Sequence, residues 1–343
     1  MSGSRRTIGM LGAAAFAALA FAPVLLPGYL VFQVSLGLTY AIAILGLNLL
    51  MGFNGQISLA QGVFFALGGY IVAILMTDHA VPIYLAIPIA VAATALLGAL
   101  IGIPALRLQG LQLAIITLVL AALVPSLIMR FDSITKGTSG IAIIKPEAPA
   151  WLRVEQDTWL YLICLAGAGL CVLVMLRLVG GDTGRRLRAV RDNATIAESF
   201  GVHVAATRIA AFATSAAFGG FAGGLYAMVN AFVSPDSFQL FKSFEFLAGA
   251  IIGGITSITG AFVGAVIVIF LPEWSADINL ALTGVIYGSV LVVMMLVARE
   301  GVVGLVTKAL SKVFSTRTTR TARQDNTSSE DSGRALVASV EKK

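Results

Sequence analysis

Long apolar runs, separated by short polar segments, dominate the chain. Asp, Glu, Lys and Arg are absent from residues 7–77, 79–106, 108–129, 158–176, 209–235, 246–272 and 278–298. Most of these runs reach or exceed the roughly 20 residues that an α-helix needs to cross a bilayer. The pattern predicts an all-α, polytopic integral membrane protein. We expect crossings near 8–26, 30–51, 57–77, 83–103, 109–130, 158–178 and 207–231, with a further set between 238 and 298.

The basic residues set the orientation of these crossings and the path of the run 246–272. With the N-terminus inside, the loops that hold Arg107 and residues 177–208, together with both tails, contain 18 of the 23 Lys and Arg. The positive-inside rule makes that side cytoplasmic. A single crossing by 246–272 would place the basic C-terminal tail outside. We therefore predict two shorter passes that meet at the Gly-rich "GGITSITGA" (253–261), about ten crossings in all, and both termini in the cytoplasm.

The composition agrees with a membrane protein and separates an apolar domain from a polar C-terminal tail. Of the 343 residues, 58% are hydrophobic and 12% are charged, against about 25% charged in a soluble domain. Arg5 and Arg6 precede continuous apolar sequence without a cleavage site, so we do not expect a cleaved signal peptide. We assign 1–310 to a transmembrane domain. The tail, 311–343, is rich in Thr, Ser, Arg and Asp, and we expect a disordered cytoplasmic extension.

One polar stretch, "FNGQISLAQG" (53–62), interrupts the first and longest uncharged run. Amide and hydroxyl groups at bilayer depth lose their bonds to water unless protein or a wet cavity replaces them. Asn-Gly is also a turn signal. Two interpretations remain open: a plain cytoplasmic turn between crossings, or a helix break beside a solute pathway, which we favour. The candidate pathway residues are Asn48, Asn54, Gln56, Ser58 and Gln61.

A second polar segment, residues 180–206, separates two crossings on the inner side. Leu187, Val190, Ala194 and Ala197 fall within an arc of roughly 80° at 3.6 residues per turn, which predicts a short amphipathic helix. Gly201 ends the pattern as a C-terminal glycine would. The helix either lies on anionic lipid through its arginines or inserts its apolar stripe into a groove of a soluble partner.

The chemical groups of enzymes and pumps are missing from the sequence. It has no P-loop motif, and His79 and His203 assemble no catalytic or metal cluster with its two cysteines. We place every carboxylate at or beyond a membrane end, with Glu245 the nearest to a span. A proton-coupled transporter usually carries an ionisable residue within the membrane. The sequence thus predicts a non-enzymatic protein without a cofactor or metal of its own, driven by energy from a partner.

Three motifs in order carry a family resemblance. "LGLNLLMGFNGQISLAQGVFFALGGY" (45–70) is followed by "RAVRDNATIAESFGVHVAATRIAAFATSAAFGGFAGGLYA" (188–227), and then by "SPDSF" and "GGITSITGAFVGA". Over residues 30–300 the chain resembles the permease subunits of bacterial branched-chain amino acid ABC transporters. The resemblance implies a ten-helix importer fold with inverted-repeat-like halves. It also implies a coupling helix for the ATPase that includes Arg188, Arg191, Asp192, Asn193, Ala197, Glu198 and Gly201.

The same resemblance implies a set of partners. These are two ATP-binding subunits that hold ATP and magnesium, a second homologous permease, and a periplasmic solute-binding protein at a bacterial inner membrane; nothing points to nucleic acid. Asp192, Ala194 and Ala261 depart from residues common in the family. Related permeases that import urea or short amides share these motifs, so that substrate stays an alternative. A channel, a secondary transporter and a scaffold are the remaining ones.

Overall fold

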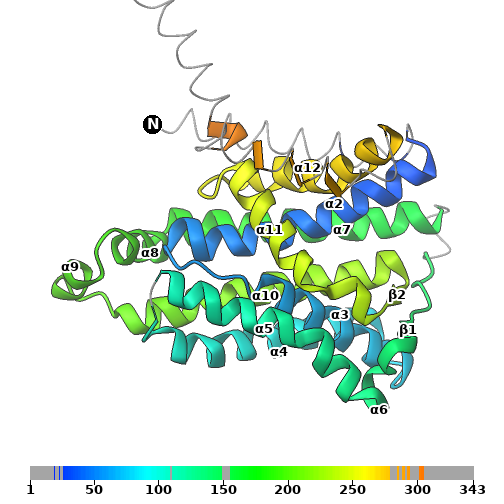
Figure 1. Cartoon of the computed structure of the whole chain (residues 1–343), viewed down its shortest axis with the longest axis horizontal. Helices are drawn as coiled ribbons and strands as arrows, with labels where there is room; N and C mark the ends of the chain where they lie inside the picture. The colour runs from blue at the N-terminus through cyan, green and yellow to red at the C-terminus, as the bar shows by residue number, and fades with distance from the viewer. Residues whose placement is uncertain are drawn as a thin grey trace, which may run out of the picture.

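The computed structural model describes residues 26–108, 110–148 and 155–278, and a few separate residues between 19 and 304. Within these ranges the chain forms a helical bundle (Figure 1). The first predicted crossing, most of the last one and the tail 311–343 lie outside the described residues. The prediction of an all-α, polytopic membrane protein is confirmed, because six of the described helices are long and apolar enough to cross a bilayer.

The bundle is built from eight principal helices among the described residues. Six contain the candidate spans, and two, α3 and α11, are shorter. Their bounds are α2 Gly28–Asn48, α3 Gln61–Thr77, α4 Ile83–Ala105, α5 Leu111–Arg130, α7 Gln156–Gly180, α10 Val204–Asn230, α11 Leu240–Gly253 and α12 Ile258–Ile278.

Small elements close the two ends of the bundle. At one end, on the left in Figure 1, α8 (Asp182–Asp192) and α9 (Ala194–Ser199) connect α7 to α10. The opposite end carries α6 (Asp132–Thr135), η2 (Gly137–Ser139), η3 (Pro235–Phe238) and a two-stranded antiparallel sheet. In that sheet β1 (Ile141–Ala142) pairs with β2 (Phe232–Val233), and Ile141 lies opposite Val233.

The centre of the bundle is formed by α2 and α10. Protein buries 78% of the α2 span and 67% of the α10 span, compared with 28% of α4 and 33% of α5 and α7. Helix α10 approaches α3 so closely that their backbones touch, because a Cβ atom at Gly68 would overlap the carbonyl oxygen of Gly220. The outer helices therefore present apolar side chains to the bilayer while glycine packs the centre.

The chain turns back into the bundle after α2. A π-helical segment, η1 (Leu49–Phe53), ends the span, and residues 54–60 continue without helical structure to the start of α3. The Gln61 side chain donates a hydrogen bond of 2.8 Å to the carbonyl oxygen of Ala43 in α2. Ala43 lies about 15 Å along the axis from Phe53, at 1.5 Å per residue. Helix α3 therefore begins inside the bundle at Gln61, later than residue 57, at which the sequence predicts the start of the crossing.

A second entry comes from the opposite end. After β2 and η3 the chain starts α11 at the depth of Tyr40, whose hydroxyl lies 2.6 Å from the Lys242 ammonium. The starts of α3 and α11 meet there, because a Cβ atom at Gly62 would overlap the hydroxyl of Ser243. Helix α11 then ends at Gly253 and α12 begins at Ile258, so the predicted division at 253–261 is confirmed. Of the two passes predicted to be short, only α11 is short, with 14 residues, because α12 has 21 residues.

Candidate functional site

All five amide and hydroxyl residues of the predicted pathway are buried, with exposed fractions of 0 to 7%. Three of them bond within the protein. Gln61 contacts α2 through Ala43 and also accepts a hydrogen bond of 3.1 Å from the Ser215 hydroxyl of α10. Asn48 donates to the carbonyl oxygen of Ser257 at 3.1 Å, and the Ser58 hydroxyl accepts from the backbone N–H of Ala60 at 3.2 Å. Gln61 and Asn48 thus hold neighbouring segments together, whereas Ser58 bonds within its own segment.

The other two polar residues face a cavity. Asn54 donates a hydrogen bond of 2.6 Å to the Gln56 side chain, while the Asn54 side-chain oxygen has no partner among the described residues. Both amides line a cavity of about 190 Å³ with Arg191 and Arg208. Gly55 makes the turn with a positive φ of 74°. The segment is therefore a turn beneath α8 whose two amide side chains are buried, while Gly55 and Ile57 are exposed.

The coupling segment contains two helices, so the expectation of one continuous amphipathic helix is wrong. Asn193 separates α8 from α9 and is the N-cap of α9, because its side-chain oxygen accepts a hydrogen bond of 3.0 Å from the N–H of Ile196. Asn is among the favoured residues at this position. Gly201 follows the end of α9 with a φ of +80°, as its sequence position predicts.

The apolar stripe of this segment is already covered by the protein itself. Leu187, Val190 and Ala197 are at most 4% exposed. The exposed apolar side chains lie elsewhere: Ile196 is 55% and Phe200 84% exposed. The sequence interpretation overlooked these two because it followed only the helical stripe. The available signal was a large apolar pair in an otherwise charged segment.

Arg191 connects the coupling segment to the end of the α2 span. Its guanidinium donates a hydrogen bond of 2.8 Å to the carbonyl oxygen of Gly52 in η1, and a Cβ atom at Gly55 would lie 2.7 Å from Arg191 Cγ. Arg191 also forms an ion pair of 3.0 Å with Asp192. Of the other predicted coupling residues, Glu198 is exposed and Arg188 half-buried. Arg188 and Glu198 have no ion-pair partner in the described part of the chain.

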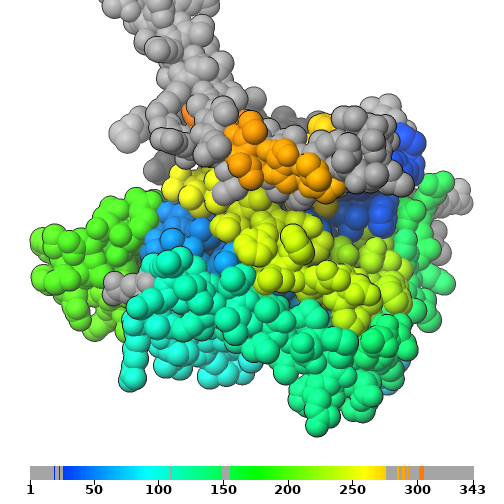
Figure 2. Space-filling model, viewed as in Figure 1, coloured from blue at the N-terminus to red at the C-terminus, as the bar shows by residue number. Residues whose placement is uncertain are grey.

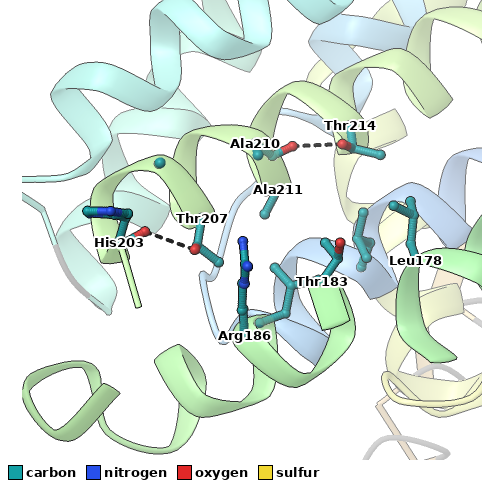
Figure 3. Close-up of a pocket in the computed structure, with 11 residues that line it drawn as sticks. Leu178, Thr183, Arg186, His203, Thr207, Ala210, Ala211 and Thr214 are labelled. Carbon is teal, nitrogen blue, oxygen red and sulfur yellow. Dashed lines mark hydrogen bonds between the residues drawn. The ribbon is translucent and has the colours of Figure 1, made fainter. Parts of the chain in front are cut away.

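A second cavity, of about 320 Å³, lies on the other side of α8 (Figure 3). Arg186 extends from α8 toward Thr207 and Ala211 of α10. The Thr207 hydroxyl donates to the His203 carbonyl at 2.9 Å and Thr214 donates to Ala210 at 2.7 Å, so both are satisfied by their own helix. Helix α8 is thus not packed directly on α10 here.

A charged cluster lies where α11 begins, which corrects the expectation that every carboxylate lies at or beyond a membrane end. The Lys242 ammonium is 3.1 Å from a Glu245 carboxylate oxygen and 2.6 Å from the Tyr40 hydroxyl. The Tyr40 hydroxyl is also 3.2 Å from that carboxylate. Because Tyr40 belongs to the middle of the α2 span, Glu245 is an ionisable residue within the bundle. The argument against a secondary transporter, that no ionisable residue lies within the membrane, therefore no longer holds.

Comparison with known proteins identifies the family. Residues 29–298 match the family described as "Branched-chain amino acid transport system / permease component". The high-affinity branched-chain amino acid transport system permease protein LivM of Escherichia coli K12 is 32% identical over 290 residues, which cover 78% of this chain and 68% of that protein. LivM of Salmonella typhimurium is also 32% identical, with 76% and 67% covered.

A more distant relative is matched over nearly its whole length. The permease protein LivH of Salmonella typhimurium is 23% identical over 79% of this chain and 93% of its own length. Among solved structures, none matches the chain significantly. The family match extends from the start of α2 to the last predicted crossing and includes both the buried break and the coupling segment. The chain therefore belongs to the permease-component family of branched-chain amino acid transport systems.

Proposed function

We propose that this chain is the membrane subunit of an ATP-driven importer of branched-chain amino acids. Its relatives are named as permeases of such systems. Two ATP-binding subunits supply ATP and magnesium, a second homologous permease completes the pathway, and a solute-binding protein delivers the amino acid from the periplasm. The end of the bundle that carries α8 and α9 faces the cytoplasm, because these two helices hold four of the basic residues counted above as internal.

The hydrogen bond from Arg191 to Gly52 is the observation that carries this proposal. It joins the coupling segment to the turn that opens the buried polar break. The cavity between α8 and α10 leaves unfilled space on one side of α8, into which the helix can shift. A displacement of α8 by the ATPase subunits would therefore reach Asn54 and Gln56 through Arg191 and Gly55.

The surface available to the ATPase is the exposed pair Ile196 and Phe200. Since Leu187, Val190 and Ala197 are buried in the protein itself, they do not insert into a partner groove. The lipid-surface alternative is weaker, because Arg185 pairs with Asp182 and Arg191 is engaged with Gly52. We therefore assign docking to Phe200 and Ile196, with Asp192 and Glu198 fixing the register.

The test compares Phe200→Ala with Arg188→Ala in the assembled transporter. Truncating an exposed aromatic anchor of an interface typically costs 2 kcal/mol or more, so transport and solute-stimulated ATP hydrolysis should both fall by about tenfold or more in Phe200→Ala. Arg188→Ala removes one solvent-accessible charge and should have little effect. Equal, mild effects of both substitutions would contradict the coupling assignment. Ala197→Arg, by contrast, should disturb the folding of the segment itself.

Orientation has its own test. With Cys164 and Cys171 replaced by Ala, a cysteine at Gly181 should react with a membrane-impermeant reagent only from the cytoplasmic side. A cysteine at Ala148, at the opposite end of the bundle, should react only from outside. Reaction of Gly181→Cys from outside would reverse the proposed topology.

Competition separates the amino acid from the amide alternative. Import of labelled leucine should be inhibited by unlabelled isoleucine and valine, and it should be insensitive to urea and acetamide. The mid-depth Lys242–Glu245 pair supports this expectation, because a zwitterion can bind both members through opposite charges, whereas an uncharged amide offers only its dipole. Import of urea without import of leucine would select the alternative.

A further inference from the structure

The ion pair of Lys242 and Glu245 lies at the middle of the bundle. Its partner Tyr40 is about 18 Å along the α2 axis from Gly28 and about 20 Å from Phe53. The pair therefore sits near the centre of a 26-residue span. Charged groups at this depth are costly, and they face protein or water rather than lipid.

The pair is nevertheless open to the outside of this protomer. The side chain of Lys242 is 18% exposed and that of Glu245 is 27% exposed. Helix α11 is visible at the centre of the face in Figure 2, beside α5. Because lipid contact would be unfavourable here, the open side of the pair fits a water-filled pathway or the surface of the second permease that completes it.

Both charged groups also have bonding capacity left. A lysine ammonium has three donors, and two of them are used, by Tyr40 and by Glu245. One oxygen of the Glu245 carboxylate takes part in all of its hydrogen bonds in the described part of the chain. A carboxylate can thus bind the third Lys242 donor, and an ammonium can bind the other Glu245 oxygen, without breaking the present pair.

We propose that Lys242 and Glu245 bind the α-carboxylate and α-ammonium groups of a zwitterionic amino acid during its passage through the permease. This inference rests on the proposed importer function. The pair and the ligand are each electrically neutral, so loading the site adds no net charge to the membrane interior. A cation or an anion alone would leave one member of the site without compensation.

The side chain of the amino acid has an apolar surface beside this site. Phe241 and Phe244, on the same side of α11 as Glu245, are 73% and 41% exposed, and their ring centroids are 6.5 Å apart. An aliphatic side chain would cover them while the two charges are held by Lys242 and Glu245. The chemical class of the ligand is thus an apolar amino acid with both main-chain charges.

The deciding variant is the double substitution Lys242→Met/Glu245→Gln, studied in the complete transporter. Replacing both members of a buried pair by neutral groups of similar size is often tolerated by the fold. Two quantities are measured: assembly with the partner subunits, and equilibrium binding of L-leucine in the absence of the solute-binding protein. We expect normal assembly and leucine affinity reduced by about tenfold or more, the loss typical of charge-assisted hydrogen bonds.

Competition experiments on the unsubstituted transporter show which charged groups of the ligand are needed for binding. L-Leucinamide lacks the carboxylate and N-acetyl-L-leucine lacks the ammonium, so neither should compete with L-leucine. A matched control neutralises the ion pair between Lys136 and Asp78, 3.4 Å apart at the end of the bundle. Lys136→Met/Asp78→Asn should bind leucine as the unsubstituted transporter does.

Two results would overturn the site. Leucine binding and import at the original level in the double variant would show that the pair is not needed for the ligand. Failure of the double variant to assemble would show that the pair serves the fold. An unsubstituted transporter that imports no amino acid would instead refute the proposed function, and the site with it.

Discussion

Helices α3 and α11 both begin at mid-depth, yet they treat polar groups in opposite ways. The chain reaches α3 from the α8–α9 end and α11 from the β1–β2 end, and the two starts meet at Gly62 and Ser243. At α3 the Gln61 amide is 2% exposed and bonded to α2 and α10. At α11 the charges bond mainly to each other and remain partly open.

The contrast shows that polarity at membrane depth has two uses. An amide that is fully bonded to neighbouring backbone and side chains fixes the position of a helix, and its removal should affect stability. A charged pair with unused donors and acceptors on an open face is available to a ligand, and its removal should affect transport. Burial and bonding capacity, rather than polarity, distinguish the two.

The largest effect is expected from Gly68→Ala, which would separate α3 from α10. The added methyl group would overlap the backbone of Gly220, which cannot rotate away as a side chain can. We expect a loss of about 2–3 kcal/mol of folding free energy, measured by thermal unfolding in detergent. Gly37→Ala is the matched control, because no atom lies within 4 Å of the position of its Cβ. Equal stability of both variants would refute the backbone contact.

A smaller loss should follow from Gln61→Leu, which tests the structural role of the first helix start. The change leaves the Ser215 hydroxyl without its acceptor and removes the bond to Ala43. Interhelical hydrogen bonds in membranes contribute modestly, so about 1–2 kcal/mol should be lost. Import per folded transporter should stay unchanged. A stable variant with defective import would place Gln61 in the solute pathway instead.

Next in size is Gln56→Leu, in the part of the break that lines the 190 Å³ cavity. Here we expect assembly to remain intact while import falls about fivefold, corresponding to about 1 kcal/mol for one hydrogen bond. Asn54→Leu should behave in the same way. Ile57→Leu, an apolar exchange in the same segment, is the control. Normal import by both amide variants would remove them from the pathway.

The smallest effect is predicted for Arg191→Met, which cuts the bond between the coupling segment and Gly52. Because the side chain is exposed to solvent, we expect only a two- to fivefold drop in solute transported per ATP hydrolysed. Arg188→Met removes the same charge from the same helix without that bond. If the two variants reduce coupling equally, the loss reflects charge and not the link to η1.

Much of the fold could be predicted because bilayer thickness fixes the length of apolar runs. The spans of α2, α4, α5, α7 and α10 follow from that rule, and the basic residues correctly required a division near 253–261. The start of α3 could not be predicted, because residues 57–60 are as apolar as a helix and only tertiary contacts show that the chain is not helical there. The depth of Glu245 could not be predicted, because Lys242 and Glu245 resemble the charged border of a span.

The candidate site was predictable in composition and less so in arrangement. Clustered amides in an uncharged run indicated the break, but not which of them bond inward and which face a cavity. In the coupling segment, helical periodicity favoured one helix through Asn193. Asn is also a strong N-cap residue, and its bond to Ile196 places Ile196 and Phe200 on a separate short helix. The capping preference of Asn193, and not the spacing of the apolar residues, therefore determines where the helix is divided.

The shortness of α11 has a consequence for the synthesis of the protein. Its 14 residues extend about 21 Å, less than the roughly 30 Å of the hydrocarbon core, and two of them are charged. Such a segment cannot enter the bilayer alone and must be carried in with α10 and α12. Helix α3 faces a related delay, because Ser215, a partner of Gln61, belongs to a helix that emerges from the ribosome much later. Helix α3 therefore makes its final contacts only after α10 has been synthesised.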